Sequence, residues 1–453
     1  MTAGPGPRTG PGAAGGQASW LIRGAEIAGP GGRGSTDLLL AGGTITAIGA
    51  GLSEAGAHVL DAAGLIALPG LVDLHTHLRE PGREDAETVD TGTRAAALGG
   101  FTAVHAMANT DPVADTAGVV EQVWRLGREA GHCDVQPVGA VTVGLAGDQL
   151  AELGAMATSA AAVRVFSDDG RCVSDPLLMR RALEYVKAFD GVIAQHAQDP
   201  RLTEGAQMNE GAVSGRLGLA GWPAVAEEAV IARDCLLAAH VGSALHVCHV
   251  STAGSVEIIR WAKSKGWRVT AEVTPHHLLL TDELIEGYDP VYKVNPPLRT
   301  AADVEGLRRG LADGTIDCVA TDHAPHPAEA KDTEWADAAF GMTGLEVALR
   351  AVQQAMVETG LLDWAGVADR MSARPAAIGR LDGYGAPRHG APLAAGSPAN
   401  LVLYDPAAAE AVDPAAHASR SRNTPFAGLV LPGQVVATFL RGTPTVLDGK
   451  LAR

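Results

Sequence analysis

The sequence has few aromatic residues and no long apolar run. The first shortage limits what the core can be built from, and the second excludes a membrane-spanning helix. Aromatic residues make up 4% of the 453 residues and hydrophobic residues 46%, so a core must be built mainly from Ala, Val and Leu. No run approaches the ~18 consecutive apolar residues that a membrane-spanning helix needs. We therefore expect a chain without a membrane segment, long enough for one large barrel and a smaller appendage.

Basic residues and paired cysteines are also scarce. The chain has 35 Lys and Arg against 52 Asp and Glu, a net charge of −17, whereas a nucleic-acid-binding protein needs a basic face. Its five cysteines form no CxxC pair, which is typical of a reducing compartment. Residues 1–18 are rich in Gly, Pro and Ala and lack the apolar core of a signal peptide. These features predict a disordered tail and a cytoplasmic protein.

The pattern of apolar runs divides the rest of the chain into three parts. Residues 19–68 contain short strand patterns separated by turn residues. From 69 to 385, eight short apolar runs alternate with helical stretches, which is the rhythm of a (β/α)₈ TIM-like barrel. Strand patterns return in 386–453, and we expect them to join the N-terminal strands in one composite β domain. The predicted class is therefore α/β.

Polar residues that can bind a metal gather where the barrel strands end. His75 and His77 are two residues apart, so on a strand both imidazoles point the same way. A single strand histidine is more often structural, and an Asp in a turn often serves the turn. Five successive strand ends that each supply His or Asp indicate a shared site, because barrels place their catalytic residues at these ends. Histidine with carboxylate predicts a catalytic Zn²⁺ or Mn²⁺ site. The other candidates are Asp168, Asp169, His196, His249 and Asp322.

Several stretches carry a resemblance to a known family. "DLHTHLREPG", "SDDG", "AQHAQD", "HVCHVST", "KVNPPLR" and "ATDHAPH" occur in family order from about residue 19 to 450. With them the chain resembles the class I bacterial dihydroorotases of the amidohydrolase superfamily. That resemblance implies a zinc-dependent cyclic amide hydrolase. Such an enzyme reversibly closes N-carbamoyl-L-aspartate to L-dihydroorotate and water in de novo pyrimidine (UMP) biosynthesis.

The resemblance implies one or two zinc ions per subunit and a set of ligands. His75 and His77 with Asp322 would hold one ion, and His196 with His249 would hold a second. Many amidohydrolases bridge two ions with a carboxylated lysine, but no lysine occurs between His132 and Tyr185. Asp169 is therefore the expected bridge, with Asp168 as the alternative.

Asp322 and Arg79 receive further roles. Asp322 would take a proton during attack and deliver it to the leaving amide nitrogen; it could instead be a ligand only, or a helix cap. Arg79 continues the alternation of His75 and His77, and its guanidinium fork suits the substrate carboxylate. A salt bridge from Arg79 to Glu80 or Glu84 is the simpler alternative.

The remaining substrate contacts come from the resemblance alone. His77, Asn109 and His326 would join Arg79 around the substrate carboxylate. Asn295, with backbone groups near Phe340 and Gly341, would bind the ring amides. Both asparagines could instead be turn-forming residues next to proline. The polar segment 326–341 follows the last barrel strand, and we expect it to cover the substrate.

Other readings stay open from the sequence. An allantoinase or a hydantoinase would share the barrel, but hydantoinases usually have the bridging lysine and allantoinase-like sequences carry Asn where this chain has Arg79. An inactive homologue that scaffolds aspartate carbamoyltransferase would typically lack metal ligands. An active enzyme could also bind aspartate carbamoyltransferase, and we expect a homo-oligomer.

Overall fold

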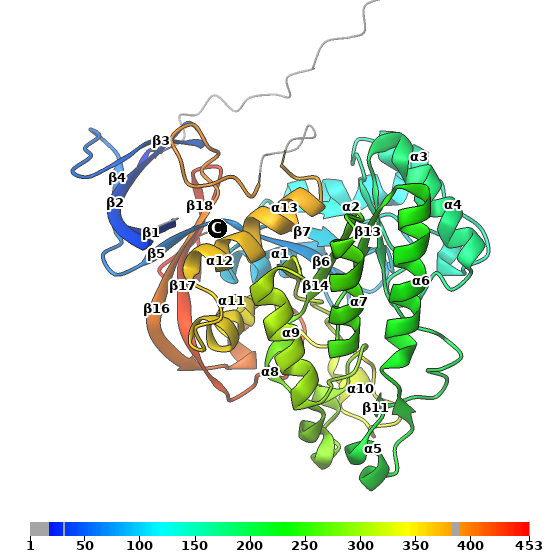
Figure 1. The fold of residues 1–453 in the computed structure, drawn as a ribbon. Helices are drawn as coiled ribbons and strands as arrows, with labels where there is room; N and C mark the ends of the chain where they lie inside the picture. The colour runs from blue at the N-terminus through cyan, green and yellow to red at the C-terminus, as the bar shows by residue number, and fades with distance from the viewer. Residues whose placement is uncertain (1–17, 30–31, 383–388, 453) are drawn as a thin grey trace, which may run out of the picture.

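A barrel and a large sheet lie side by side in the computed structural model, which describes residues 18–29, 32–382 and 389–452 (Figure 1). The predicted tail lies outside the described residues except for Ala18. Within the described ranges, no helix is both long and apolar enough to cross a bilayer.

Eight parallel strands form the barrel, as the alternation of apolar runs predicts. Two sheets contain them, in the orders β6-β7-β8 and β15-β14-β13-β10-β9. Parallel bridges between Gly139 and Phe166 and between Thr76 and His323 join the two sheets at both edges and close the barrel. The strands are β6 (Leu71–Thr76), β7 (Phe101–Ala106), β8 (Asp134–Pro137), β9 (Val165–Phe166), β10 (Val192–Gln195), β13 (Ala244–Val247), β14 (Val269–Val273) and β15 (Cys318–Val319).

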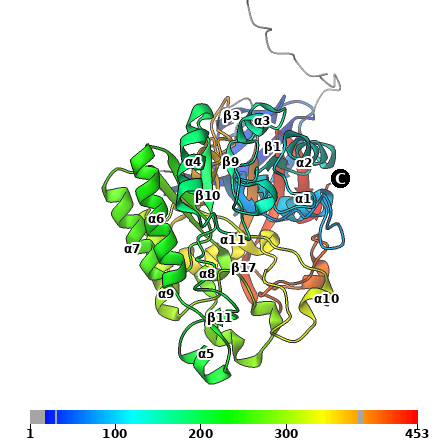
Figure 2. The same cartoon turned by 90° about the vertical axis from the view of Figure 1, so that its right-hand side faces the viewer.

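Helices cover the outside of the barrel, and Figure 2 shows α4, α6, α7 and α9 along one side of it. Threonines at the N-caps of α1, α7 and α9 accept a hydrogen bond from the first turn, which fixes where these helices begin. The helices are α1 (Val89–Leu98), α2 (Ala117–Ala130), α3 (Leu153–Thr158), α4 (Pro176–Val186), α5 (Ala212–Leu217), α6 (Val225–Val241), α7 (Ala253–Ser264), α8 (Pro275–Leu279), α9 (Ala301–Asp313), α10 (Ala328–Lys331), α11 (Ala348–Val352), α12 (Trp364–Ala368) and α13 (Arg374–Ile378).

The second sheet joins the two ends of the chain, as the strand patterns predict. β16 pairs antiparallel with β5, with Leu401 opposite Pro69 and Leu403 opposite Ala67. The order is β19-β18-β17-β16-β5-β1-β2-β3, and β4 pairs with β1. Its strands are β1 (Trp20–Gly29), β2 (Gly32–Ala41), β3 (Thr44–Gly49), β4 (His58–Asp61), β5 (Ile66–Pro69), β16 (Leu401–Ala411), β17 (Val430–Leu440), β18 (Thr443–Leu447) and β19 (Lys450–Leu451). The proposed domain boundaries at 68/69 and 385/386 stay predictions.

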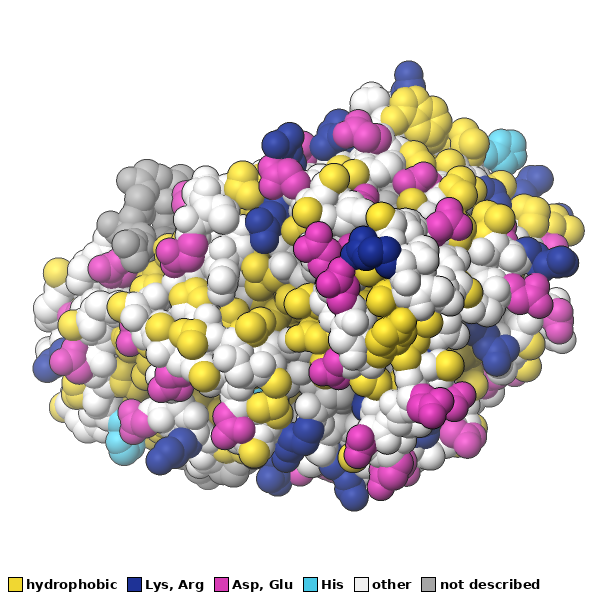
Figure 3. Space-filling model, turned by 90° about the horizontal axis from the view of Figure 1, so that it is seen from below, with side chains coloured by type: hydrophobic (Ala, Val, Ile, Leu, Met, Phe, Trp, Pro, Cys, Tyr) yellow, Lys and Arg dark blue, Asp and Glu magenta, His cyan; other side chains and the backbone are white. Residues whose placement is uncertain are grey.

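The carboxyl ends of the barrel strands face the lower end of Figure 1, where α5, α10 and the short pair β11 (Met208–Asn209) and β12 (Gly221–Trp222) lie. Figure 3 views the molecule from this side and shows acidic, basic and apolar side chains interspersed over it. In barrels of this type the loops at the carboxyl ends carry the functional side chains. The lower end is therefore where the predicted site residues should meet.

Candidate functional site

Six predicted site residues converge at the carboxyl ends of the barrel strands. His75 lies in β6, and the others lie in the turns just beyond β6, β9, β10, β13 and β15. All six are buried, with at most 5% of each residue exposed. Closure of the barrel brings together side chains as far apart in the sequence as His77 and Asp322, which are separated by 245 residues. The five residues beyond strand ends are His77, Asp169, His196, His249 and Asp322.

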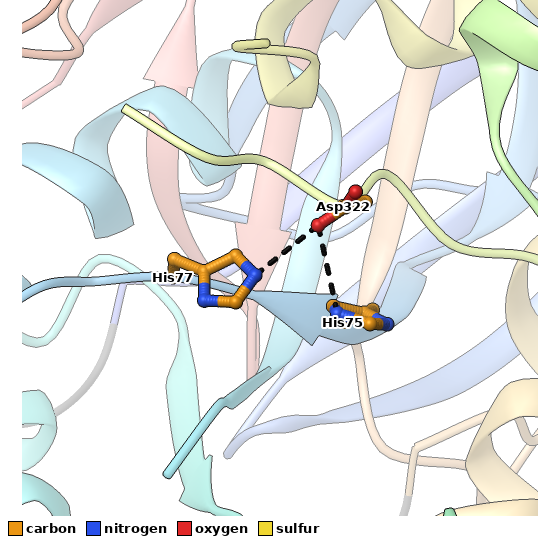
Figure 4. Close-up of side chains that lie close together, drawn as sticks. All are labelled: His75, His77 and Asp322. Atoms are coloured by element: carbon orange, nitrogen blue, oxygen red, sulfur yellow. Dashed lines mark hydrogen bonds and ion pairs between the residues drawn. The ribbon is translucent and has the colours of Figure 1, made fainter. Parts of the chain in front are cut away.

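Asp322 lies between the two histidines at the end of β6 (Figure 4). Its Oδ1 is 3.1 Å from Nε2 of His77 and 3.5 Å from Nε2 of His75. The two imidazoles approach one carboxylate oxygen because side chains two residues apart point to the same face of a strand. These three donor atoms lie close enough together to hold one cation.

Asp169 occupies the centre of the cluster and contacts all four imidazoles. Its Oδ1 is 3.3 Å from Nε2 of His75, 3.2 Å from Nδ1 of His196 and 3.2 Å from Nε2 of His249. Its Oδ2 is 3.3 Å from Nε2 of His77. One carboxylate thus links the histidines of β6 to those that follow β10 and β13. This is the arrangement that a bridge between two cations requires.

The neighbouring Asp168 faces away from this cluster and serves the backbone. Its carboxylate accepts hydrogen bonds from the backbone N–H groups of Val141 (2.8 Å) and Thr142 (2.9 Å), and from the hydroxyl of Thr142. Burial raises the pKa of Asp168, and these three hydrogen bonds oppose that effect. Of the two adjacent aspartates, only Asp169 is therefore placed to bridge.

Burial and charge oppose each other at the carboxyl groups of the cluster. Burial alone raises the pKa of Asp322, but the hydrogen bond from His77 and the charge of His75 lower it to about 2. Burial also raises the pKa of Asp169, and the surrounding imidazoles outweigh it and lower that pKa well below its usual range. Both groups are therefore carboxylates at neutral pH, which is the form that binds cations.

The donor set fits a metal ion. Nε2 of His75 is buried and makes no hydrogen bond, although it faces the carboxylates of Asp169 and Asp322. Imidazole nitrogens with carboxylate oxygens are the ligands of catalytic zinc sites in enzymes. A divalent cation among these atoms would compensate the buried carboxylates and use the free nitrogen of His75.

The outward nitrogens of three of these histidines are also fixed by hydrogen bonds. Nδ1 of His77 lies 2.8 Å from Oδ1 of Asn109, and Nε2 of His196 lies 2.7 Å from Oε1 of Gln198. Nδ1 of His75 lies 2.7 Å from Oε1 of Glu272. When a metal binds, an oxygen acceptor on one ring nitrogen keeps the proton there, and the other nitrogen releases its proton and offers its lone pair to the metal.

Arg79 reaches the cluster in a different way from the predicted strand alternation. Strand β6 ends at Thr76, and Arg79 has a left-handed backbone with φ 63°. Its side chain is buried, and its Nε donates to the carbonyl oxygen of Pro325 at 3.1 Å. Burial lowers the pKa of Arg79 to about 10, with the charges of Asp322 and Asp169 opposing that shift, so the guanidinium stays protonated at neutral pH.

The simpler alternative for Arg79 was a salt bridge to Glu80 or Glu84, but both carboxylates accept hydrogen bonds from the backbone. The Glu80 carboxylate accepts a hydrogen bond from the backbone of Val89, and the Glu84 carboxylate accepts one from the backbone of Gly82.

The two predicted asparagines form hydrogen bonds with side chains in the cluster or next to it. Asn109 uses its Oδ1 for His77, so only its Nδ2 remains as a donor toward a substrate. Asn295 donates from Nδ2 to Oε1 of Gln198 at 3.1 Å, and its buried Oδ1 has no hydrogen-bond partner. That free oxygen is an acceptor suited to an amide N–H.

The predicted contacts near Phe340 are largely satisfied within the protein. Nε2 of His326 lies 2.8 Å from the carbonyl oxygen of Phe340, and the N–H of Gly341 donates to the backbone carbonyl oxygen of Lys293 at 2.9 Å. Burial and the charge of Arg79 lower the pKa of His326 to about 3, so its ring is neutral. With Nε2 carrying the proton, Nδ1 is an acceptor and cannot donate to a carboxylate. His326 therefore suits an N–H group better than the carboxylate that the sequence analysis assigned to it.

Known proteins resemble this chain over nearly its whole length. A family model described as "Dihydro-orotase-like" matches residues 64–255. A dihydroorotase from Streptomyces coelicolor is 70% identical over 431 residues, which cover 95% of this chain and 99% of that protein. A dihydroorotase from Mycobacterium tuberculosis is 56% identical over 96% of this chain and 99% of its own length. The chain belongs to the dihydroorotase family.

Solved structures place this dihydroorotase-family chain among cyclic amidohydrolases with the same fold. An L-hydantoinase (dihydropyrimidinase) from Arthrobacter aurescens superposes with a TM-score of 0.84 at 26% identity, over 96% of this chain and 97% of that one. A dihydropyrimidinase from Brevibacillus agri shares the fold with a TM-score of 0.80 at 23% identity, over 96% of both chains. The predicted fold, a barrel with a composite sheet, is thus confirmed. The family is one of metal-dependent hydrolases.

Sequence reasoning missed part of this family member's site. His246 is buried against Glu272, whose carboxylate also contacts His75, and neither contact was expected. Glu272 was not singled out at all. A lone acidic residue inside the apolar run "RVTAEVT" was the available signal, because a buried strand leaves a carboxylate no solvent.

Proposed function

We propose that this chain catalyses the dihydroorotase reaction at the cluster around Asp169. N-carbamoyl-L-aspartate would close to L-dihydroorotate and water, and the ring would open in the reverse direction. The observation that carries the proposal is the joint burial of four imidazoles, two carboxylates and the charged Arg79 at one barrel mouth. An allantoinase or hydantoinase activity is the competing proposal, and it is tested in the same assay.

We propose zinc as the metal, in one or two positions. His75, His77 and Asp322 would hold one ion, His196 and His249 a second, and Asp169 would contact both. Bound there, zinc supplies a Lewis acid that polarises the amide carbonyl and acidifies water. No lysine is needed for the bridge, because Asp169 already reaches both pairs of histidines.

Asp322 would move the proton in ring opening. Its carboxylate is ionised at rest, because its pKa lies at about 2. The Oδ2 atom is available to take a proton from the attacking water, since Oδ1 already faces His75 and His77. The same oxygen would then pass the proton to the amide nitrogen that leaves the ring, as general base and general acid in turn.

Substrate binding would divide between the carboxylate and the ring. Arg79 would hold the substrate carboxylate, assisted by Nδ2 of Asn109 and the edge of His77. Asn295 Oδ1 and Nδ1 of His326 would accept ring N–H groups. The carbonyl oxygens of Phe340 and Gly341 keep a second lone pair each for the same purpose.

The first experiment measures dihydroorotate hydrolysis, with zinc counted on the same samples, for the native protein and Asp322→Asn. General acid–base catalysis typically contributes about 10²–10⁴-fold, so we expect kcat to fall by at least about 100-fold with most zinc retained. Asp363→Asn is the control: Asp363 caps α12, and Asn caps a helix equally well. Native protein with zinc but without activity on dihydroorotate would reject the substrate, and hydantoin and allantoin would be tried next.

Three further proposals concern the protein in the cell. We infer a homo-oligomer, a location in the cytoplasm, and an association with aspartate carbamoyltransferase. Light scattering of the purified protein measures the first. Co-purification of aspartate carbamoyltransferase with the tagged chain tests the last. Native protein without zinc and without activity, yet bound to that enzyme, would favour the scaffold alternative.

A further inference from the structure

Glu272 is a buried carboxylate directly beneath the proposed metal centre. It lies in β14 and is 1% exposed. Its Oε1 is 2.7 Å from Nδ1 of His75 and 3.3 Å from the backbone nitrogen of His249, and its Oε2 is 3.0 Å from Nε2 of His246. A buried carboxylate without such partners would be strongly unfavourable, so these contacts are what keeps it charged inside the barrel.

The hydrogen bonds of Glu272 determine where the protons lie. An ionised carboxylate only accepts, so Nδ1 of His75 and Nε2 of His246 must both be donors. His246 is held from its other side, because its Nδ1 lies 2.9 Å from the hydroxyl of Thr270. With the Nδ1 proton held by Glu272, Nε2 is the nitrogen of His75 that would offer its lone pair to a metal bound beside Asp169 and Asp322.

The same oxygen of Glu272 reaches the second half of the centre. His249 has φ 32°, a backbone conformation that residues with a Cβ rarely adopt. Its N–H donates to Oε1 of Glu272 and so supports that conformation. One carboxylate oxygen thus contacts a histidine from each of the two proposed metal positions, His75 through its ring and His249 through its backbone.

A role for Glu272 as a direct metal ligand is less consistent with these contacts. Its carboxylate lies near the thiols of Cys248 and Cys318, and such groups can hold a metal. Burial, however, raises the pKa of both thiols well above the usual range, so the thiolates that a metal needs are disfavoured. Both oxygens of Glu272 are also already engaged by histidines.

We propose that Glu272 is the positioning residue of the metal centre, which sets the tautomer of His75 and the backbone of His249 together. The carboxylate of Glu272 is held by the ring of His246, and that ring is held by the hydroxyl of Thr270. The proposal rests on the proposed metal site and not on the identity of the substrate. It makes metal affinity, and not only turnover, depend on a residue that touches neither substrate nor metal.

The test is zinc affinity of Glu272→Gln, measured by chelator competition without substrate. The amide keeps the size of the carboxylate but offers one acceptor and one donor where two acceptors are needed. Loss of such an outer partner typically weakens metal binding by about 10–100-fold, and we expect a loss in this range. The thermal unfolding midpoint of the metal-free protein shows whether the variant folds.

Glu227→Gln is the matched control. Glu227 is also buried and also accepts hydrogen bonds, from the Ser251 backbone (3.0 Å) and the Ser255 hydroxyl (2.7 Å), on α6. It should keep native zinc affinity. Folded Glu272→Gln with the zinc affinity of Glu227→Gln would overturn the proposal.

A second variant covers the case in which Glu272→Gln does not fold. His246→Phe keeps a ring in place but removes the donor to Oε2, so zinc affinity should fall in the same direction by a smaller factor. Unchanged affinity in this variant would overturn the proposal. Native protein that binds zinc but leaves dihydroorotate intact would reject the proposed function alone, because the affinity measurement uses no substrate.

Discussion

The barrel mouth buries charged side chains, whereas the core of the composite sheet is apolar. At the mouth, four imidazoles, three carboxylates and a guanidinium are almost inaccessible to solvent, and Arg79, His249 and Asp322 all have positive φ. In the sheet, the core consists of Ile22, Ala25, Leu38, Leu40, Ile45, Ala62, Ala67, Ala399, Leu401, Leu403, Ala437 and Phe439. The mouth therefore holds the chemistry at a cost in strain and desolvation, and apolar burial elsewhere offsets that cost.

The largest effect should come from Asp169→Asn, which removes the shared carboxylate of the mouth. Breaking even one buried pair costs about 3–5 kcal/mol, and Asp169 serves four histidines. We expect kcat/KM to fall more than about 10³-fold, or about 4 kcal/mol, with loss of bound zinc. Steady-state kinetics and zinc analysis measure both.

The adjacent Asp168→Asn provides the contrast to Asp169→Asn. Asp168 serves the backbone of Val141 and Thr142, so its loss should lower stability by about 1–3 kcal/mol while zinc stays bound. Equal zinc loss in both variants would contradict the assignment of the bridge to Asp169.

For Phe439→Ala in the sheet, we expect a loss of stability without a loss of activity. Phe439 is fully buried and packs edge-on against Trp20 at 5.4 Å. A cavity of this size should lower the free energy of unfolding by about 3 kcal/mol or slightly more. Turnover per folded molecule should stay near native, since no mouth residue changes. Urea unfolding and kinetics on the same sample test this separation, and a large fall in kcat of the folded protein would show that activity depends on the packing of the sheet.

Arg79→Lys separates substrate binding from metal binding within the mouth. Lysine keeps the charge but loses the planar fork that can hold both oxygens of a carboxylate. One lost hydrogen bond to a charged group is worth about 1.5–3 kcal/mol, so KM for dihydroorotate should rise by about 10–100-fold. Zinc content should not change, because Arg79 is not among the proposed ligands. A native KM would show that the substrate carboxylate binds elsewhere.

The fold and the metal cluster could be predicted from sequence because both follow local periodicity. Eight apolar runs gave the barrel strands, and residues at their ends had to meet at one mouth. The placement of Arg79 was argued from strand alternation, but the chain leaves the strand at Thr76 and Arg79 has a positive φ. Periodicity carries no information on such a turn.

Contacts between distant strands could not be predicted in this way. Glu272 and His246 meet because β13 and β14 pair in a register that places both rows inside the barrel. The state of His326 depends on the carbonyl of Phe340, fourteen residues along a loop. Tertiary geometry, and not local pattern, decides such partners.

The smallest expected effect concerns Lys331, in the segment that was expected to cover the substrate. Lys331 is buried, and its Nζ donates to the carbonyl oxygens of Lys293 (3.0 Å) and Ala339 (2.8 Å). Burial, together with the nearby Lys293 charge, lowers the pKa of Lys331 from 10.5 to about 7. Between these two values the unfolded chain holds a proton that the folded chain lacks, so stability should rise with pH there. Below about pH 7 both states hold the proton, and this contribution becomes constant.

Removal of Lys331 should therefore flatten the pH dependence of stability. Between pH 7 and 9 the free energy of unfolding of the native protein should gain about 2 kcal/mol over that of Lys331→Met. Lys265→Met, at an exposed position, should keep the native slope. Equal slopes in all three proteins would mean that solvent reaches the Lys331 ammonium and that 326–341 is not packed down. A flattened slope would extend the contrast with the sheet to the loops. At neutral pH a buried lysine with a lowered pKa helps to hold this segment at the mouth, whereas the sheet cluster named above is held together by apolar side chains.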